Sequence, residues 1–185
     1  MKESVKKYRT TMTAFTLAAF AKTYSPEIGG VKDIFTMMSF RNRRRETEKM
    51  IGMLSTSQPV RVTVIDDKER YIKSVTEMLT EQYEFQELPM DMLAENVDLS
   101  GLPQIDTSFI YQPEQQSELP AGLPVPEQLE TTGAVMHLGV HIMPEGEHCS
   151  VGIVYKRDKY TKDYIERFAE RYISELYQLT SEHEK

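Results

Sequence analysis

The chain has 185 residues, which is close to the length of one domain of about 150 residues. It carries 22 Lys and Arg against 29 Asp and Glu, a formal net charge of −7, and this disfavours general binding to nucleic acid or to an anionic membrane. The only cysteine, Cys149, excludes an intramolecular disulfide framework and is typical of a reducing compartment. We therefore expect a cytoplasmic protein.

The N-terminal region contains the most apolar stretch, from Ala14 to Ala21. Eight residues are less than half of the roughly 20 that cross a bilayer, so no membrane span is predicted. The lysines before it are similar to the start of a signal peptide, but no clean cleavage site follows. Because Pro26 and then Gly29 and Gly30 end the stretch, it is interpreted as a buried helix closed by a turn.

The next part of the chain predicts two strands and two helices. Residues 31–40 and 59–65 favour strands, the second by alternation of Val60, Val62 and Val64. The charged run 41–49 between them indicates a solvated loop or a short helix. After Asp66 and Asp67, which can cap a helix, apolar residues recur at helical spacing over 71–79. Pro89 fits the first turn of a shorter helix that contains Met90 and Leu93.

The C-terminal part predicts a strand over 105–112, a long proline-rich loop over 113–133, and then a hairpin and a helix. Residues 136–142 alternate, a turn follows at Pro144 to Gly146, and residues 150–155 form the return strand. Apolar spacing predicts the final helix over 161–179. The fold class is α/β or α+β, a mixed sheet flanked by helices with a C-terminal antiparallel hairpin and helix.

Histidines are the obvious candidates for acid–base or metal chemistry. On a strand, His137 and His141 would share a face but lie about 13 Å apart, too far to bind one metal. His148 and Cys149 are adjacent, so their side chains would point to opposite faces and do not predict a catalytic pair. No phosphate-binding glycine loop, dinucleotide fingerprint or nucleophile elbow is present. No catalytic, metal or cofactor residue is predicted.

One region does carry a recognisable motif. Arg41, Asn42 and Arg43 are followed by Ile51 and Gly52, and the motif ends at Arg61. The remaining motif residues, which include the next stretch and the downstream matches, are Thr56, Ser57, Gln58, Pro59, Arg61, Gln86, Pro89, Asp98, Ser100 and Tyr111. Together they resemble the fifth to seventh motifs of the condensation domains of nonribosomal peptide synthetases, which are chloramphenicol acetyltransferase-like acyltransferases.

The resemblance implies the C-terminal half of such a domain, spanning residues 1–185. In this family an amine attacks a carrier-bound thioester in a tunnel between two lobes, and the catalytic His-His-x-x-x-Asp-Gly motif belongs to the N-terminal half. That motif is absent from these 185 residues. The resemblance places residues 41–54 near the tunnel floor and makes residues 113–133 a crossover to the other lobe. It also implies the phosphopantetheine of a partner carrier protein as the only cofactor nearby.

The sequence departs from the family pattern at several positions. Phe85 stands where the family has His or Asn, Val97 replaces the leading arginine of the seventh motif, and residues 55–58 differ from the usual Val-Asn-Thr-Leu-like stretch. Arg61 alternates with Val60 and Val62, so we expect it to support folding rather than chemistry.

Three functions therefore stay open. The first is one lobe of a condensation enzyme for secondary-metabolite biosynthesis, inactive alone and paired with an N-terminal lobe or a larger synthetase. The second is a non-catalytic remnant that contacts a carrier protein, a peptide or itself as a homo-oligomer. The third is an unrelated α/β enzyme. The eleven methionines suit either adaptable packing against a partner or simple filling of the core.

Overall fold

A computed structural model of the chain describes residues 1–88, 90–98, 100–101, 103–112 and 134–181. The proline-rich segment 113–133 and Pro89 lie outside the described residues. In chain order the elements are α1 (Lys2–Lys7), α2 (Met12–Tyr24), a 3-10 turn (Ser25–Ile28), β1 (Asp33–Phe40), β2 (Thr56–Thr63), α3 (Lys68–Glu84), α4 (Met90–Asn96), β3 (Thr107–Tyr111), β4 (Leu138–Glu145), β5 (His148–Tyr155) and α5 (Lys162–Thr180).

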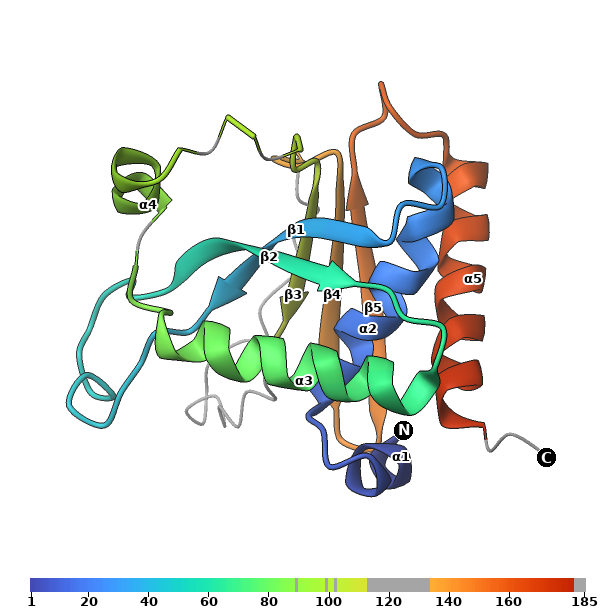
Figure 1. Ribbon diagram of the computed structural model, residues 1–185, viewed down its shortest axis with the longest axis horizontal. Helices are drawn as coiled ribbons and strands as arrows, with labels where there is room; N and C mark the ends of the chain where they lie inside the picture. Colours follow the sequence, from blue (N-terminus) through green and yellow to red (C-terminus); the bar gives the residue numbers. More distant parts are fainter. Residues whose placement is uncertain (89, 99, 102, 113–133, 182–185) are drawn as a thin grey trace, which may run out of the picture.

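The five strands form one mixed sheet in the order β2-β1-β3-β4-β5 (Figure 1). β1 and β2 are antiparallel, β3 runs parallel to both β1 and β4, and β4 and β5 form an antiparallel hairpin. The fold class expected from the sequence, a mixed sheet with helices and a C-terminal hairpin and helix, is confirmed.

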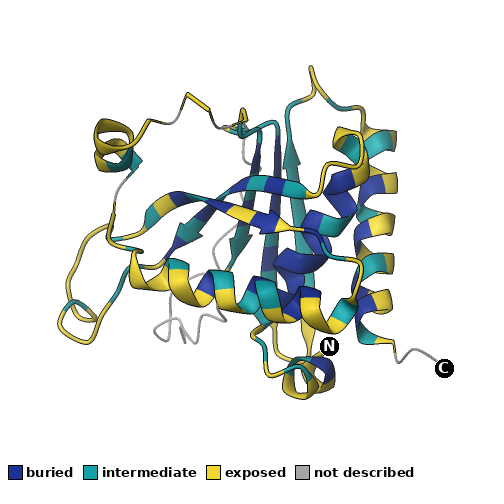
Figure 2. Ribbon diagram, in the orientation of Figure 1, coloured by how far each residue is buried: buried dark blue, intermediate teal, exposed yellow. Residues whose placement is uncertain are grey.

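Helix α2 is the centre of the core. Thr11 caps its first turn by accepting a hydrogen bond from the Ala14 amide at 3.1 Å, and Gly29 and Gly30 follow its end with positive φ angles of 79° and 76°. Ten of its thirteen residues are buried, which explains the apolar stretch in the sequence. Figure 2 shows the buried residues concentrated in α2 and along the strands.

Helices α3 and α5 both pack on α2 through one apolar stripe each. Each also contributes a buried tyrosine that donates a hydrogen bond to a carbonyl of α2. Tyr71 reaches the Ala18 oxygen at 2.8 Å, and Tyr172 reaches the Thr16 oxygen at 3.1 Å. Burial raises the pKa of both phenols, so both stay neutral donors. These bonds fix the position of each helix relative to α2.

Several element boundaries differ from the sequence-based expectation. β2 begins at Thr56, before Pro59, because the whole segment pairs with β1 from Asp33 to Phe40. The hairpin turn lies at Gly146 and Glu147, and Pro144 belongs to β4. Helix α1 was not predicted, since six mostly polar residues carry no apolar stripe. Among the described residues, no helix is long and apolar enough to cross a membrane.

Candidate functional site

The two faces of the sheet have different surroundings. The three long helices, α2, α3 and α5, lie on one face, where alternate strand residues such as Ile34, Val62 and Phe109 are almost fully buried. The intervening residues point to the opposite face and are mostly half-buried or exposed. The apolar side chains on that face are Phe35, Met37, Pro59, Ile110, Met143 and Val154, and polar ones such as Ser108 and His141 lie among them. We call this surface the open face.

The open face contains a cavity of about 250 Å³ over β3, β4 and β5. Its lining is largely apolar and includes Ile110, Val135, Met136 and Val154, together with the imidazole of His141. A Cβ atom added at Gly139 would lie 2.8 Å from the Ser108 hydroxyl, so a larger residue here would require the Ser108 side chain to move. Gly139 has no side chain to fill the cavity beside His141.

The imidazole of His141 is uncharged near neutral pH, because burial lowers its pKa below the ordinary value of 6.5. It can therefore accept or donate one hydrogen bond to a bound amide or hydroxyl group without carrying charge into the apolar cavity. His137 lies just before β4, and its Nδ1 atom is 3.3 Å from the Asp106 carboxylate. Sequence reasoning missed this pair, because the two residues are 31 positions apart (137 − 106 = 31).

The other candidates for polar chemistry do not converge. His148 is exposed, whereas Cys149 faces the helix side of the sheet, and burial raises the pKa of its thiol. Within the described residues, no three His, Cys, Asp or Glu side chains gather as metal ligands.

A second part of the site is the loop 41–55 between β1 and β2. The Arg43 guanidinium donates hydrogen bonds to three backbone carbonyls of this loop, those of Thr47 (3.1 Å), Met50 (2.8 Å) and Gly52 (2.9 Å). Two neighbouring backbone positions have positive φ angles, Asn42 at 49° and Gly52 at 147°. Arg41 adds an ion pair with Glu48 at 2.7 Å. Arg41 and Arg43 thus tie distant parts of the loop 41–55 together.

The tip of this loop is apolar and exposed. Ile51 is fully exposed at 104% of its reference area, and Met53 is 90% exposed. Figure 1 shows the loop extending well beyond the sheet. These two exposed apolar side chains make the loop tip a candidate contact surface.

A third part of the site joins β2 to the turn that follows α3. The Gln58 side chain is 3% exposed and donates hydrogen bonds to the carbonyls of Phe85 (2.8 Å) and Leu88 (2.6 Å). Its own oxygen accepts a bond from Gln82 at 2.7 Å. Beside it, Thr56 donates to the Gln86 carbonyl at 2.6 Å. Thr56 and Gln58 therefore bind the turn that follows α3 to β2.

The remaining predicted motif residues are scattered. Asp98 only accepts a hydrogen bond from the nearby Ser100 amide at 2.9 Å, and Tyr111 is half-buried at the end of β3. Ser57 is exposed on the odd-numbered side of β2, where Pro59 is half-buried. Pro89 lies outside the described residues.

Arg61, which we expected to support folding rather than chemistry, lies away from the core. Its side chain is 60% exposed on the face opposite Val60 and Val62, where it pairs with Asp33 through two hydrogen bonds of 3.1 and 2.9 Å. Alternation along a strand puts neighbours on opposite faces, so contact with the core does not follow from adjacency to buried valines.

Arg44 and Gln82 were not identified as site residues from the sequence. Arg44 bonds Glu87 at 2.8 Å and so ties the loop 41–55 to the turn after α3. The Arg44–Glu87 ion pair and the Gln82–Gln58 hydrogen bond each join residues more than 20 positions apart, and no local sequence pattern predicts such contacts.

The sequence profile of the condensation domain matches residues 1–185. The chain belongs to the condensation-domain family. Its relatives include tyrocidine synthase 3 of Brevibacillus parabrevis, 25% identical over 176 residues, and nonribosomal peptide synthetase kk1B of Curvularia clavata, 28% identical over 171 residues. Those alignments cover 89% and 86% of this condensation-family chain but only 3% and 1% of the two synthetases.

Solved structures show the same fold. The condensation domain of the Monacolin K polyketide synthase MokA superimposes with a TM-score of 0.78 at 15% identity, covering 97% of this chain and 43% of that one. The epimerization domain from the third module of tyrocidine synthetase B gives a TM-score of 0.72 at 18% identity, covering 95% and 43%. The condensation-family chain thus spans less than half the length of these structures.

Proposed function

We propose that residues 1–185 form the C-terminal lobe of a condensation-type domain, which joins carrier-bound substrates through an amide bond in nonribosomal peptide synthesis. In this proposal the chain works in the cytoplasm and is not catalytic alone. A separate N-terminal lobe supplies the His-His-x-x-x-Asp-Gly motif. Coverage of less than half of each solved structure agrees with a single lobe.

The observation that carries this proposal is the open face with its cavity. In the part of the chain that the structure describes, the long helices cover one side of the sheet, which leaves apolar side chains such as Ile110 and Val154 on the other side incompletely covered. Burying them against another body is favourable. The exposed tip at Ile51 and Met53 adds a second apolar surface. A second lobe that packs against both would enclose the cavity beside His141 and turn it into one wall of a tunnel.

Within that tunnel the residues of this chain bind and orient, and they do not transfer protons. His141 is half-buried and its pKa is lowered, so it offers a neutral hydrogen-bonding group to an amide or thioester carbonyl. The loop held by Arg43 fixes the floor, which keeps the two substrates aligned. The chain needs no cofactor of its own; the phosphopantetheine arm of a carrier protein would enter between the lobes.

The first experiment is a native mass spectrum of the assembly isolated from its own cells through a tag at Lys185. The proposal expects the chain together with a stoichiometric partner, or a longer covalent chain, that contains His-His-x-x-x-Asp-Gly. The purified chain alone should form no amide from carrier-bound donor and acceptor. Amide formation by the chain alone, or an assembly without that motif, would overturn the proposal.

A matched pair of variants tests the surface. Ile51→Asp with Met53→Asp places charge on the loop tip and should weaken association with the motif-bearing partner about tenfold or more. Val31→Asp changes an exposed apolar residue (49% exposed) in the turn before β1 and should leave association unchanged. If both variants associate with the motif-bearing partner equally well, the loop tip is not part of the interface.

The alternative function is a stand-alone, non-catalytic protein that keeps the fold and binds a carrier protein or peptide. The observation that favours it is the altered fifth motif, since Gln58 is used to bind the turn after α3. It expects the assembly above to contain a carrier protein or peptide and no catalytic lobe.

A further inference from the structure

The two edge strands of the sheet differ in their protection against pairing. On β2, Val64 donates to the Lys32 carbonyl at 2.7 Å, so the even-numbered residues of β2 bond β1 and the odd-numbered ones point their backbone groups outward. Pro59 and Arg61 occupy outward positions. Proline has no N–H to offer and a charged side chain opposes pairing, so this edge is blocked in two ways.

The edge formed by β5 has neither a proline nor a charged residue at its outward positions. Lys156 donates to the His137 carbonyl at 3.0 Å, which makes the even-numbered residues of β5 the partners of β4. The backbone groups of Cys149, Val151, Ile153 and Tyr155 therefore point outward. In the part of the chain that the structure describes, no strand pairs with this edge. From 149 to 155 the strand contains no proline and no charge.

We propose that β5 pairs antiparallel with β5 of a second copy, around a two-fold axis at Gly152. In this register Val151 lies opposite Ile153 of the second copy, and Cys149 lies opposite Tyr155. Every outward N–H and C=O of the four residues then finds a partner in each copy, and the two five-stranded sheets become one continuous sheet. A two-fold contact of this kind closes after two copies.

The side chains around the axis are complementary in this register. Gly152 meets itself, and Ser150 meets Val154, so no like charges face each other. From Cys149 to Tyr155 no charged side chain opposes the pairing in this register.

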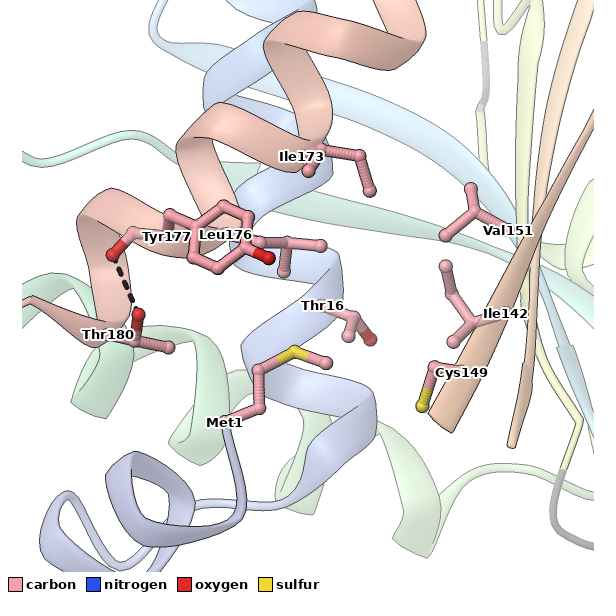
Figure 3. A pocket seen from close by; sticks show the side chains of 9 residues that line it. All are labelled: Met1, Thr16, Ile142, Cys149, Val151, Ile173, Leu176, Tyr177 and Thr180. Carbon is pink, nitrogen blue, oxygen red and sulfur yellow. Dashed lines mark hydrogen bonds between the residues drawn. The ribbon is translucent and has the colours of Figure 1, made fainter. Parts of the chain in front are cut away.

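An apolar cavity lies beside the β5 edge. It has a volume of about 310 Å³ and is lined by Cys149 and Val151 of β5 and by Ile173 and Tyr177 of α5 (Figure 3). Ile173 is 40% exposed and Tyr177 is 70% exposed. The proposed register places Tyr155 of the second copy next to Cys149, at the border of this cavity. Pairing would cover apolar surface as well as satisfy the backbone.

A cysteine pair tests the register in the full 185-residue chain. Tyr155→Cys adds a thiol opposite Cys149 of the second copy, with Cα atoms about 5.5 Å apart, which is within disulfide range. Within one chain the two cysteines are about 20 Å apart and cannot join. Under mild oxidation, Tyr155→Cys should give a disulfide-linked dimer, whereas Ile153→Cys, displaced by two residues, should give far less. Equal cross-linking of the two variants would overturn the register.

A charge pair tests the association. Gly152→Lys and Gly152→Glu each place like charges together at the axis. The atom nearest to the added Cβ would be the end of the flexible Met143 side chain, at 3.4 Å. Each variant alone should dimerise about tenfold or more weakly than the parent chain by light scattering, and a mixture should restore dimers. Thr63→Lys, on the β2 edge, should have no effect.

A monomeric parent chain, or a dimer unaffected by both Gly152 substitutions, would overturn the proposal. The second outcome would point to another surface, such as the open face. Because these measurements use the chain alone, their outcome does not depend on whether it joins an N-terminal lobe.

Discussion

Phe109 and Ile110 are adjacent in β3, yet they belong to surfaces with different roles. Phe109 faces the helices and is completely buried, with its ring centroid 5.7 Å from that of Phe20. Ile110 points to the open face and lines the cavity beside His141. The helix-covered face holds the chain together, and the open face keeps apolar surface available. The same strand therefore serves stability on one side and, in our proposal, assembly on the other.

The largest effect is expected from removing a side chain of the covered face. Phe109→Ala should lower the free energy of unfolding by about 3–5 kcal/mol, because it leaves a cavity between β3 and α2. Ile110→Ala should cost about 1 kcal/mol, since this side chain is only partly buried. Urea denaturation of both variants measures the difference. Equal losses would mean that the open face is already packed within the chain.

The next largest effect concerns the polar network that joins the two motifs. Gln58→Ala should cost about 2–3 kcal/mol, because it leaves the carbonyls of Phe85 and Leu88 and the amide of Gln82 without their partner. Gln82→Ala removes only the bond to Gln58 and should cost about 1 kcal/mol. The urea midpoints of the two variants show which substitution lowers stability more. A Gln58→Ala protein as stable as the parent would show that the turn after α3 holds without this residue.

Much of the covered face was predictable from the sequence, and little of the site was. Alternation at Val60 and Val62 and the apolar stretch of α2 follow directly from which side must be buried. The roles of Arg43 and Gln58 were not predictable, because each bonds backbone carbonyls that any residue could supply. The resemblance to the family motif singled out Gln58 but did not indicate that it faces the helix side. Arg61 alternates with buried valines, but strand geometry places its side chain on the opposite face, where it pairs with Asp33.

A smaller effect of opposite sign is expected at Thr36. This residue is fully buried on the covered face, and its hydroxyl has no hydrogen-bond partner among the described residues. Thr36→Val keeps the shape and removes the unsatisfied group, so it should stabilise the fold by about 1 kcal/mol. Thr16→Val is the matched control, because the Thr16 hydroxyl donates to the Met12 carbonyl at 2.7 Å and its loss should destabilise. Destabilisation by both changes would show that Thr36 has a partner.

On the open face, His141 should make stability depend on pH. Its pKa in the folded chain is below the unfolded value of 6.5, so protons bind more readily to the unfolded state. The free energy of unfolding should therefore fall as the pH drops below about 6.5. His141→Gln should reduce the loss between pH 7 and pH 5, as measured by urea denaturation at both values. An identical loss in the variant would assign the pH dependence to other groups.

The smallest effect is expected at Arg61. Its ion pair with Asp33 is exposed to solvent, although the guanidinium lowers the pKa of the Asp33 carboxyl. Exposed pairs contribute little to stability, so Arg61→Ala should leave the urea midpoint near that of the parent chain. The charge serves a different purpose in the comparison of the two edges, where Arg61 and Pro59 protect β2 from pairing. Replacing both, as Arg61→Val with Pro59→Val, should therefore leave the chain folded but prone to concentration-dependent association, measured by light scattering. If that double variant stays as dispersed as the parent, these two residues are not what distinguishes the β2 edge from the β5 edge.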